Sequence, residues 1–519
     1  MCGIVFQENV KVEEMREYME EINNTKYRGP DKSDVKVIYK VKGVNLMGFH
    51  RLAIHGLSDI GDQPMTKGRS NLVCNGEIYN YMELSKIYSN SDYKNKSDCE
   101  IILEMYVRSR EKGINYENFC NKLDGEFAFV IDDEDRGTFA CRDPYGVRPL
   151  YYGYTDEGNI NFASELKNIR KWCKNVKPFP PGHYYINNKF YKYKKDKVAF
   201  DIAKKSYSEC TIKALLESAV MKRLSSERPI GFFLSGGLDS SLIAGIGTKL
   251  MKRRITTFSI GTDASSPDLM YANKVAKHIN SWHHQILFTP EEGLEAITNV
   301  IYHLESYDCT TIRASVPMYL MSKYVKDNTD IRVILSGEGA DELFGGYLYL
   351  HNAPNEEEFH NEIQNLMDNI SNYDVLRADR CTSGNGLELR VPFLDKDLVE
   401  YVNMIDPKHK RTEIEKLILR DAFDEDIIPE EVLYRQKNGM SDAVGYSWVN
   451  FMREYAEHFV KDWNPDKYAI NTPVSKEEYM YREIYTSFFG NTEFLTHIWR
   501  PKYTSIKDPS ATLLNVFKK

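Results

Sequence analysis

A glycine-rich turn that also carries hydroxyls and a carboxylate is formed by Ser235-Gly236-Gly237-Leu238-Asp239-Ser240-Ser241. It follows a strand-like stretch that ends at Leu234 and precedes a helix-like stretch from Leu242 to Leu250. Such a turn binds phosphate well, because the first helical N–H groups point outward, the helix dipole favours an anion, and glycine lets the backbone approach closely. Ser235, Ser240 and Ser241 add hydroxyl donors, and Asp239 is suited to hold a magnesium ion on the phosphates.

The turn is not a Walker-type loop, which requires G-x-x-x-x-G-K-[ST], because the sequence contains no Gly-Lys pair. Its SGG-x-DS pattern resembles the pyrophosphate loop of ATP pyrophosphatases, which split ATP into AMP and pyrophosphate. The alternative is a plain glycine turn without a ligand. The order of strand, loop and helix favours the nucleotide-binding interpretation.

The amino terminus, Met1-Cys2-Gly3-Ile4, is a second place where chemistry is possible. Cys is small enough for an aminopeptidase to remove Met1, which would leave a terminal Cys with its thiol beside its own α-amine. An α-amine, with a reference pKa of about 7.7–8.0, is partly neutral near neutral pH and can accept the thiol proton. One residue then supplies both nucleophile and base. The alternative is a buried, inert Cys near a terminus.

Three further segments favour the catalytic interpretation. Arg51-Leu52-Ala53-Ile54-His55 ends a strand with a cation suited to a carboxylate. Asn75-Gly76-Glu77 follows a strand and offers an amide side chain and a glycine N–H close together, which are the donors of an oxyanion hole. Asp98 lies at a helix start and can hold a substrate ammonium. Each segment also has a structural interpretation, such as a turn at Asn75-Gly76 or an N-cap at Asp98, but their conjunction is improbable by chance.

The elements that position these residues change in character along the chain. The first ~195 residues are rich in predicted strands. The predicted strands are Val44–Ile54, Asn71–Cys74, Glu126–Asp132 and Thr138–Arg142, the last two joined as a hairpin by Asp133–Gly137. Helical spacing of apolar residues predicts helices at Met15–Ile22 and Cys99–Arg108.

Beyond the lysine-rich stretch Lys192–Ser206, strands and helices alternate. The predicted strands are Ile230–Leu234, Ile255–Ile260, His283–Phe288 and Ile331–Leu335, and the predicted helices between them are Ser241–Met251, Asp268–Ile279 and Pro290–Leu304, the last with Thr289 as N-cap. This alternation predicts a parallel sheet covered by helices, with ligands at the carboxyl ends of its strands. From about Glu356 the pattern is mostly helical. We therefore expect domains at 1–195 and 207–519, joined by a linker at 196–206.

Bulk composition excludes several classes of protein. The chain has 519 residues, a formal net charge of −8 and 42% hydrophobic residues, so nothing favours nucleic acid or a membrane surface as a partner. The nine Cys include no C-x-x-C pair, which indicates reduced thiols in a cytoplasmic protein. No apolar run is long enough to span a membrane, and the acidic residues near the amino terminus argue against a signal peptide.

Together these patterns resemble a known family. Cys2–Ile4, Arg28–Asp31, Arg51–Ile54, Asn75–Tyr79 and Ser97–Glu100 are similar to an N-terminal-nucleophile glutamine amidotransferase. With Ser235–Ser241, Ser336-Gly337-Glu338-Gly339-Ala340-Asp341-Glu342 and Glu388–Asp395 added, residues 1–510 or so resemble the glutamine-hydrolysing asparagine synthetases.

The resemblance implies an α/β multidomain fold: an αββα N-terminal-nucleophile hydrolase domain, then a parallel-sheet domain of the ATP-pyrophosphatase type with a helical C-terminal part. It implies that glutamine is hydrolysed in the first domain and that ammonia passes internally to the second. There ATP, with Mg²⁺, activates aspartate as β-aspartyl-AMP, and ammonia displaces AMP. Such a site must shield the β-aspartyl-AMP from water, because an acyl adenylate hydrolyses in open water. A cytoplasmic homodimer is also implied.

The roles carried over by the resemblance fall into four groups. Cys2 is the nucleophile, with Asn75 and Gly76 as the oxyanion hole. The glutamine site comprises Arg51, Leu52, Ala53, Ile54, His55, Asn75, Gly76, Glu77 and Asp98. The ATP site comprises Leu234, Ser235, Gly236, Gly237, Asp239, Ser240, Ile260, Ser336, Gly337 and Lys437. Glu338 is the acid tied to forming or using the adenylate, and Asp239 and Asp341 are magnesium ligands.

One departure from the family pattern, one histidine pair and two alternative functions bear on this interpretation. His55 occupies a position where the family commonly has an aliphatic residue, so it either alters glutamine affinity or points outward. His283-His284 lacks the pattern of a metal site, so a surface or strand position is expected. A relative such as a β-lactam synthetase, which adenylates another acid, is disfavoured by Cys2 and the full glutamine site. A catalytically silent binding or regulatory protein is disfavoured because Cys2, Asp239 and Glu338 are all present.

Overall fold

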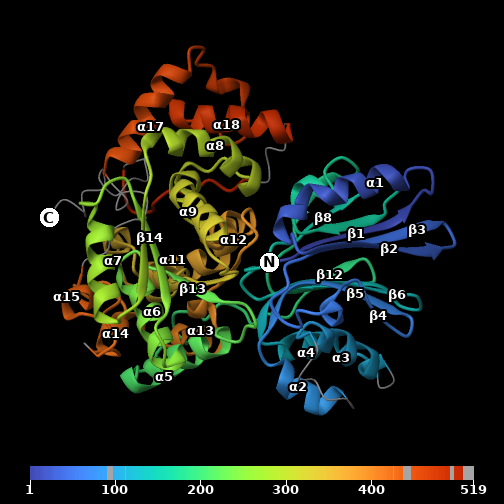
Figure 1. Cartoon of the computed structure of the whole chain (residues 1–519), viewed down its shortest axis with the longest axis horizontal. Helices are drawn as coiled ribbons and strands as arrows, with labels where there is room; N and C mark the ends of the chain where they lie inside the picture. The colour runs from blue at the N-terminus through green and yellow to red at the C-terminus, as the bar shows by residue number, and fades with distance from the viewer. Residues whose placement is uncertain (90–96, 111–112, 425, 436–445, 491–495, 506–519) are drawn as a thin grey trace. The chain divides into compact units, whose positions relative to one another are not determined.

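The computed structural model describes residues 1–89, 97–110, 113–424, 426–435, 446–490 and 496–505 (Figure 1). Within these residues the chain forms two compact units. The first unit consists of Met1–Asp196 together with two short later segments, Ser225–Arg228 and Ser383–Glu388. The second unit consists of Lys197–Leu224, Pro229–Thr382 and Leu389–Lys519.

The first unit contains two six-stranded sheets. The first sheet runs in the order β10 (Lys174–Pro178), β8 (Tyr151–Tyr154), β9 (Ile160–Ala163), β1 (Gly3–Val10), β3 (Gly43–Arg51), β2 (Lys32–Lys40). The second runs in the order β12 (Lys189–Lys192), β11 (His183–Ile186), β7 (Gly137–Arg142), β6 (Gly125–Asp133), β5 (Ser70–Ile78), β4 (Met65–Lys67). The helices are α1 (Met15–Ile22), α2 (Tyr81–Tyr88), α3 (Glu100–Arg110) and α4 (Tyr116–Lys122).

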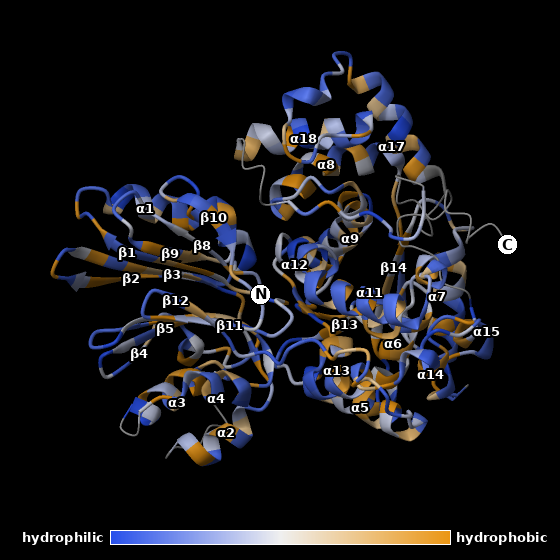
Figure 2. Ribbon diagram, turned by 180° about the vertical axis from the view of Figure 1, so that it is seen from behind, coloured by the Kyte–Doolittle hydropathy of each residue, from blue (hydrophilic) through white to orange (hydrophobic). Residues whose placement is uncertain are grey.

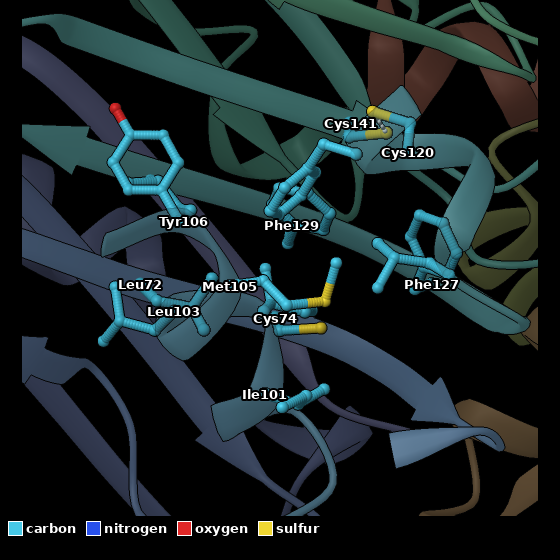
Figure 3. Packing of buried hydrophobic residues seen from close by; sticks show 14 of the residues in the cluster. Leu72, Cys74, Ile101, Leu103, Met105, Tyr106, Cys120, Phe127, Phe129 and Cys141 are labelled. Atoms are coloured by element: carbon cyan, nitrogen blue, oxygen red, sulfur yellow. Dashed lines mark hydrogen bonds between the residues drawn. The ribbon is translucent and has the colours of Figure 1, made fainter. Parts of the chain in front are cut away.

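Alternating side chains along the strands build the layers of this unit. On β6, Ala128 and Val130 pack toward the first sheet, whereas Phe127 and Phe129 pack toward α3 and α4 (Figure 3). Because successive strand residues point to opposite faces, one strand serves two apolar layers. On the far side of the first sheet, Val44 and Leu46 of β3 contact Tyr18 of α1. The unit is therefore a helix–sheet–sheet–helix sandwich, which confirms the predicted αββα fold.

The second unit is built on a five-stranded sheet in the order β15 (Trp282–Leu287), β14 (Thr256–Gly261), β13 (Ile230–Phe233), β16 (Val333–Leu335), β17 (Glu388–Arg390). The first four strands pair in parallel, as predicted. Figure 2 shows that β13 and α6 (Leu238–Met251) are largely hydrophobic, which fits burial of a central strand and its following helix.

The helices of this unit include α5 (Glu209–Arg223), α7 (Pro267–His278), α8 (Pro290–Leu304), α9 (Cys309–Asn328) and α10 (Ala340–Phe344). The later part is mostly helical, as expected: α11 (Glu356–Asn369), α12 (Asp374–Ser383), α13 (Lys396–Asn403), α14 (Leu417–Asp421), α15 (Glu430–Leu433), α17 (Tyr446–Phe459) and α18 (Lys476–Phe489). Thr289 caps α8 in a capping box with Glu292, which confirms the predicted N-cap. In the described part of the chain, no helix has the length and apolar character that crossing a membrane requires.

Candidate active sites

The amino-terminal residues of the first unit are fixed by hydrogen bonds at both ends of the Cys2 backbone. The Cys2 N–H donates to Asn75 Oδ1 at 3.0 Å, and the Cys2 carbonyl accepts from Arg28 Nε at 2.9 Å. The thiol lies 3.8 Å from the Leu52 carbonyl oxygen. Burial raises the pKa of the Cys2 thiol to about 11, so the thiol stays protonated unless a base accepts its proton. Met1 is present here, and burial lowers the pKa of its α-amine to about 6.

Asn75 presents a buried amide donor beside Cys2. It lies on β5 with 0% of its surface exposed, and its side-chain oxygen is held by the Cys2 N–H. Within the described residues, Asn75 Nδ2 makes no hydrogen bond. Leaving a buried amide donor unpaired costs roughly 1–3 kcal/mol, so a position of this kind is suited to a ligand atom that accepts the bond. The donor belongs to the same side chain that holds the Cys2 backbone, and a preorganised amide donor beside a nucleophile is the type of group that forms an oxyanion hole.

Gly76 sits where β5 approaches its neighbour closely. A Cβ at this position would lie 2.2 Å from the Glu126 carbonyl oxygen on β6, so only glycine fits. The sequence predicted a donor pair at Asn75-Gly76, and the structure keeps both residues within a paired strand rather than in a turn.

Arg51 organises the loop that follows β3. The predicted strand to Ile54 ends instead at Arg51, and residues 52–57, termed the 52–57 loop below, leave the sheet. Arg51 Nη1 donates to the Ser58 carbonyl and to Asp62 Oδ1, both at 2.8 Å, and Nη2 donates to the carbonyls of His55 and Gly56. The guanidinium thus holds the loop, with Asp62 as its carboxylate partner. Leu52, Ala53 and Ile54 are buried.

His55 faces the protein rather than solvent. Its side chain is 11% exposed, and Nε2 lies 3.3 Å from Glu77 Oε2 and 3.1 Å from the Ser225 carbonyl oxygen. Because a carbonyl only accepts hydrogen bonds, Nε2 carries a proton. Asp98 accepts a 2.8 Å bond from the Ile78 N–H, so its carboxylate is attached to the strand that carries Asn75 and Glu77. The contacts link Cys2, the 52–57 loop, Asn75, Glu77 and Asp98 in one region.

Arg28 and Asp31 hydrogen-bond to backbone groups of this region. Arg28 is buried and pairs with Glu165 at 2.7 Å while it binds the Cys2 carbonyl. Asp31 Oδ2 accepts a 2.8 Å bond from the Ala53 N–H. Sequence reasoning singled out Arg28 and Asp31 but missed Glu165, because a lone Glu after a short strand carries no pattern.

In the second unit, the predicted phosphate loop is held by internal hydrogen bonds to its serine side chains. Ser235 N–H donates to Ser240 Oγ at 3.1 Å, the two hydroxyls lie 2.9 Å apart, and the Gly237 N–H donates to Ser235 Oγ at 3.3 Å. Gly236 has φ +72°, and a Cβ there would lie 2.4 Å from the Ala272 nitrogen, so glycine is required. Gly237 is the N-cap of α6, which begins at Leu238, three residues before the predicted Ser241.

The Ser336–Glu342 stretch lies against this loop. A Cβ on Gly337 would be 2.8 Å from the Ser240 nitrogen, so the two loops touch where Gly337 has no side chain. Leu234 directly follows β13 and Ile260 is the penultimate residue of the adjacent β14, and the Leu234 N–H donates to the Phe258 carbonyl at 2.8 Å. The residues predicted from two distant motifs therefore meet at the carboxyl edge of one parallel sheet, where such sheets bind ligands.

Asp239 and Asp341 converge on one buried cation. Lys416 Nζ lies 2.8 and 2.6 Å from the two Asp239 oxygens and 2.7 Å from Asp341 Oδ1. The Lys416 side chain is 1% exposed. Sequence reasoning missed Lys416, because it stands alone before α14 without a motif. Two carboxylates that share a cation form an oxygen donor pair of the kind that Mg²⁺ accepts. Within the residues described, no group of three or more His, Cys, Asp and Glu side chains forms a metal cage.

Two arginines that the sequence did not single out complete the region. Arg377 Nη2 lies 2.6 Å from Glu338 Oε2 and 3.0 Å from Asp374 Oδ1, so Glu338 is paired with a cation. Arg435 donates to the Gly236 carbonyl and to Asp268 Oδ1, both at 2.9 Å. The predicted phosphate cation Lys437 lies outside the described residues. His283 lies on β15 and contacts the hydroxyls of Thr257 and Ser259, and burial lowers its pKa to about 4.

Known proteins match both units. Residues 1–198 match the family described as "Glutamine amidotransferase domain", and residues 211–366 and 351–507 match "Asparagine synthase". "Asparagine synthetase [glutamine-hydrolyzing]" of Brassica oleracea is 40% identical over 521 residues, which cover 94% of this chain and 86% of that protein. The "Probable asparagine synthetase [glutamine-hydrolyzing]" of Acanthamoeba polyphaga mimivirus is 39% identical and covers 99% and 100% of the two chains. The Gallus gallus protein "Asparagine synthetase [glutamine-hydrolyzing]" is 39% identical and covers 95% of each.

Proposed function

Because this chain belongs to the glutamine-hydrolysing asparagine synthetase family, we propose that it makes L-asparagine from L-aspartate, L-glutamine and ATP. The products are L-asparagine, L-glutamate, AMP and pyrophosphate, with β-aspartyl-AMP as the intermediate. The observation that carries the proposal is the Asn75 side chain, which holds the Cys2 backbone with its oxygen and, among the residues that the structure describes, keeps a buried amide donor without a partner. The family match gives the second reaction, and the Asn75 geometry supports the first.

The glutaminase step begins with removal of Met1, which turns the Cys2 nitrogen into a free α-amine. The thiol attacks the carboxamide carbon of glutamine and its proton passes to this amine, which later protonates the departing ammonia. Asn75 Nδ2 and the Gly76 N–H stabilise the oxyanion of the tetrahedral intermediate. Water then hydrolyses the thioester to glutamate. Arg51, the 52–57 loop, Glu77 and Asp98 hold the substrate carboxylate and ammonium.

The synthetase step uses the loops that meet beside α6. The β-carboxylate of aspartate attacks the α-phosphorus of ATP and pyrophosphate leaves, held by the Ser235–Ser241 amides and hydroxyls. Ammonia then attacks the acyl carbon and AMP leaves. Leu234, Ile260, Ser336 and Gly337 contact the nucleotide. Glu338 acts in forming or using the adenylate.

Asp239 and Asp341 would hold a magnesium ion, which when bound supplies positive charge to the phosphates of ATP. The residues fit this role because their carboxylates already share one cation, Lys416. Lys416, whose Nζ lies beside both carboxylates, would add a second positive charge next to such an ion. Lys437 stays a proposed phosphate cation.

The test of the proposal is Cys2→Ala. This variant is expected to lose glutamine-dependent asparagine synthesis while ammonia-dependent synthesis continues, because only the nitrogen source is removed. Equal loss of both activities would contradict the two-site scheme. Intact mass of the purified wild type should be lower by one methionine, since the nucleophile must be terminal.

Two finer proposals need their own measurements. Internal passage of ammonia predicts about one asparagine per glutamine hydrolysed even when an ammonia-consuming enzyme is added, and escape of most ammonia to that enzyme would contradict it. Dependence of pyrophosphate release on aspartate separates this function from that of a relative that adenylates another acid. We also propose a cytoplasmic homodimer, which light scattering of the purified protein and cell fractionation test.

A further inference from the structure

The short segment Ser225–Arg228, termed the tether below, belongs to the first compact unit although it lies between α5 and β13 in the chain. It is four residues long and is followed after Pro229 by β13, the strand that leads to the Ser235–Ser241 loop. No motif marks it in the sequence. Its contacts are concentrated on the 52–57 loop.

The tether binds the 52–57 loop through both backbone and side chains. Glu227 Oε1 accepts from the Gly56 N–H at 2.8 Å and Oε2 accepts from the Leu57 N–H at 3.5 Å. The Glu227 N–H donates to the Ile54 carbonyl at 3.2 Å. Arg228 Nε donates to the Ala53 carbonyl at 2.9 Å, and the Ser225 carbonyl accepts from His55 at 3.1 Å. Every loop residue from Ala53 to Leu57 is thus bound by the tether.

We propose that Glu227 and Arg228 are positioning residues for glutamine in this reaction. The inference rests on the proposed glutaminase function. Arg51 fixes the carbonyls of His55 and Gly56, whereas Glu227 fixes the N–H groups of Gly56 and Leu57. Arg51 and Glu227 thereby bind opposite groups of the 52–57 loop, the carbonyls and the N–H groups. The backbone conformation of the loop is therefore fixed before the reaction begins.

The position of the loop matters to the nucleophile. The Leu52 carbonyl lies 3.8 Å from the Cys2 thiol, and Ala53 is held from the other side by Asp31, which also lies 3.6 Å from Arg228. A shift of the loop therefore moves groups that surround the glutamine carboxamide and its α-carboxylate. Small misplacements of bound substrate cost large factors in turnover efficiency. Glu227 and Arg228 act on the substrate through the loop and not by direct contact.

The experiment measures glutaminase and ammonia-dependent synthesis in Glu227→Ala and Arg228→Ala. Glu227 is exposed and its bonds are partly open to water, so each variant should raise KM for glutamine about three- to tenfold, with kcat changed less. The KM values for ammonia, aspartate and ATP should stay within about twofold of the wild type. Glu227→Gln keeps one acceptor for the Gly56 N–H and should recover part of the loss.

The matched control is Glu134→Ala, which removes a second exposed carboxylate of the same unit, one that pairs with Arg69 and, within the described residues, makes no hydrogen bond or ion pair to the 52–57 loop. It should leave KM for glutamine unchanged. An unchanged KM in Glu227→Ala and Arg228→Ala would overturn the inference, and so would a parallel fall of ammonia-dependent synthesis, which indicates general destabilisation. If Glu227→Ala does not fold, Glu227→Gln and Arg228→Lys give the same comparison. A wild type without glutaminase activity would instead refute the proposed function.

Discussion

Lys416 is the residue whose removal gives the sharpest test of the second site. It makes three charge-assisted contacts of 2.6–2.8 Å to Asp239 and Asp341, and its side chain is 1% exposed. In Lys416→Met the two carboxylates face each other without a cation. Breaking a buried ion pair by removing one partner costs roughly 3–5 kcal/mol. The lower end applies here, because the side chains of Asp239 and Asp341 keep 13% and 14% exposure.

Separately from this stability cost, we expect the same cation to contact phosphate during adenylation, and losing a transition-state contact of about 3 kcal/mol lowers the rate about 100-fold. The assay is aspartate-dependent pyrophosphate release with saturating ammonia, which bypasses the first site. Glutaminase activity of the variant, measured as glutamate release, reports whether the first unit is intact. The expected result is loss of pyrophosphate release with glutaminase activity retained.

Lys222→Met is the matched control. Lys222 also bridges two aspartates of the second unit, Asp395 and Asp397, at 3.1 Å each. It lies on α5, away from both motif loops in the sequence, so its loss should affect stability and leave pyrophosphate release within about threefold. Retention of pyrophosphate release within threefold in Lys416→Met would refute the reasoning, as would equal losses in the two variants.

Further outcomes follow from the same geometry. Asn75→Ala should lower glutaminase kcat about 10²–10³-fold, the usual effect of removing one oxyanion donor, while ammonia-dependent synthesis continues; a smaller KM-only effect would contradict the oxyanion role. Glu338→Ala should abolish asparagine synthesis and leave glutaminase activity intact, since it removes the carboxylate that Arg377 holds. Asparagine synthesis that persists in this variant would contradict the role of Glu338 in forming or using the adenylate. Burial lowers the pKa of His283 to about 4, below the ordinary value, so the unfolded chain binds more protons between pH 6.5 and 4. Thermal stability should therefore fall as pH drops through this window, and fall less in His283→Gln; equal pH sensitivity of the two proteins would count against a buried neutral His283.

Much of the fold follows from local pattern. The apolar spacing of Met15–Ile22 and Pro290–Leu304 matches the observed helix ends, and the hairpin at Asp133–Gly137 joins β6 and β7 as predicted. These elements are determined by nearby residues, because periodicity, caps and turns act over a few positions. The strand predicted to Ile54 ends at Arg51, since the following residues bind Arg51, Asp31 and the tether instead of a neighbouring strand.

The site residues also divide into those that a local motif predicts and those that only distant contacts bring into the site. Motif residues such as Cys2, Asn75, Asp239 and Glu338 were predicted, because their types and spacing point to a reaction. Their partners were not: Lys416 lies 177 positions from Asp239, and Arg377 reaches Glu338 from α12. A single positive residue far along the chain leaves no signal in one sequence, because the contact exists only after the sheet and helices have assembled. His55 does not point outward, since it contacts Glu77 and Ser225, and its effect on glutamine affinity stays a prediction.

The first compact unit is assembled from three separate stretches of the chain, and this limits how the protein can be divided. A polypeptide that stops at Asp196 would keep all the strands of both six-stranded sheets but would leave the Gly56 N–H without Glu227. It would also lack Ser383, which accepts a hydrogen bond from Arg28 at 2.9 Å, and Glu388, which lies 3.8 Å from the Met1 amine. Hybrid enzymes that exchange this half between relatives must therefore transplant residues 225–228 and 383–388 along with it, from the same parent.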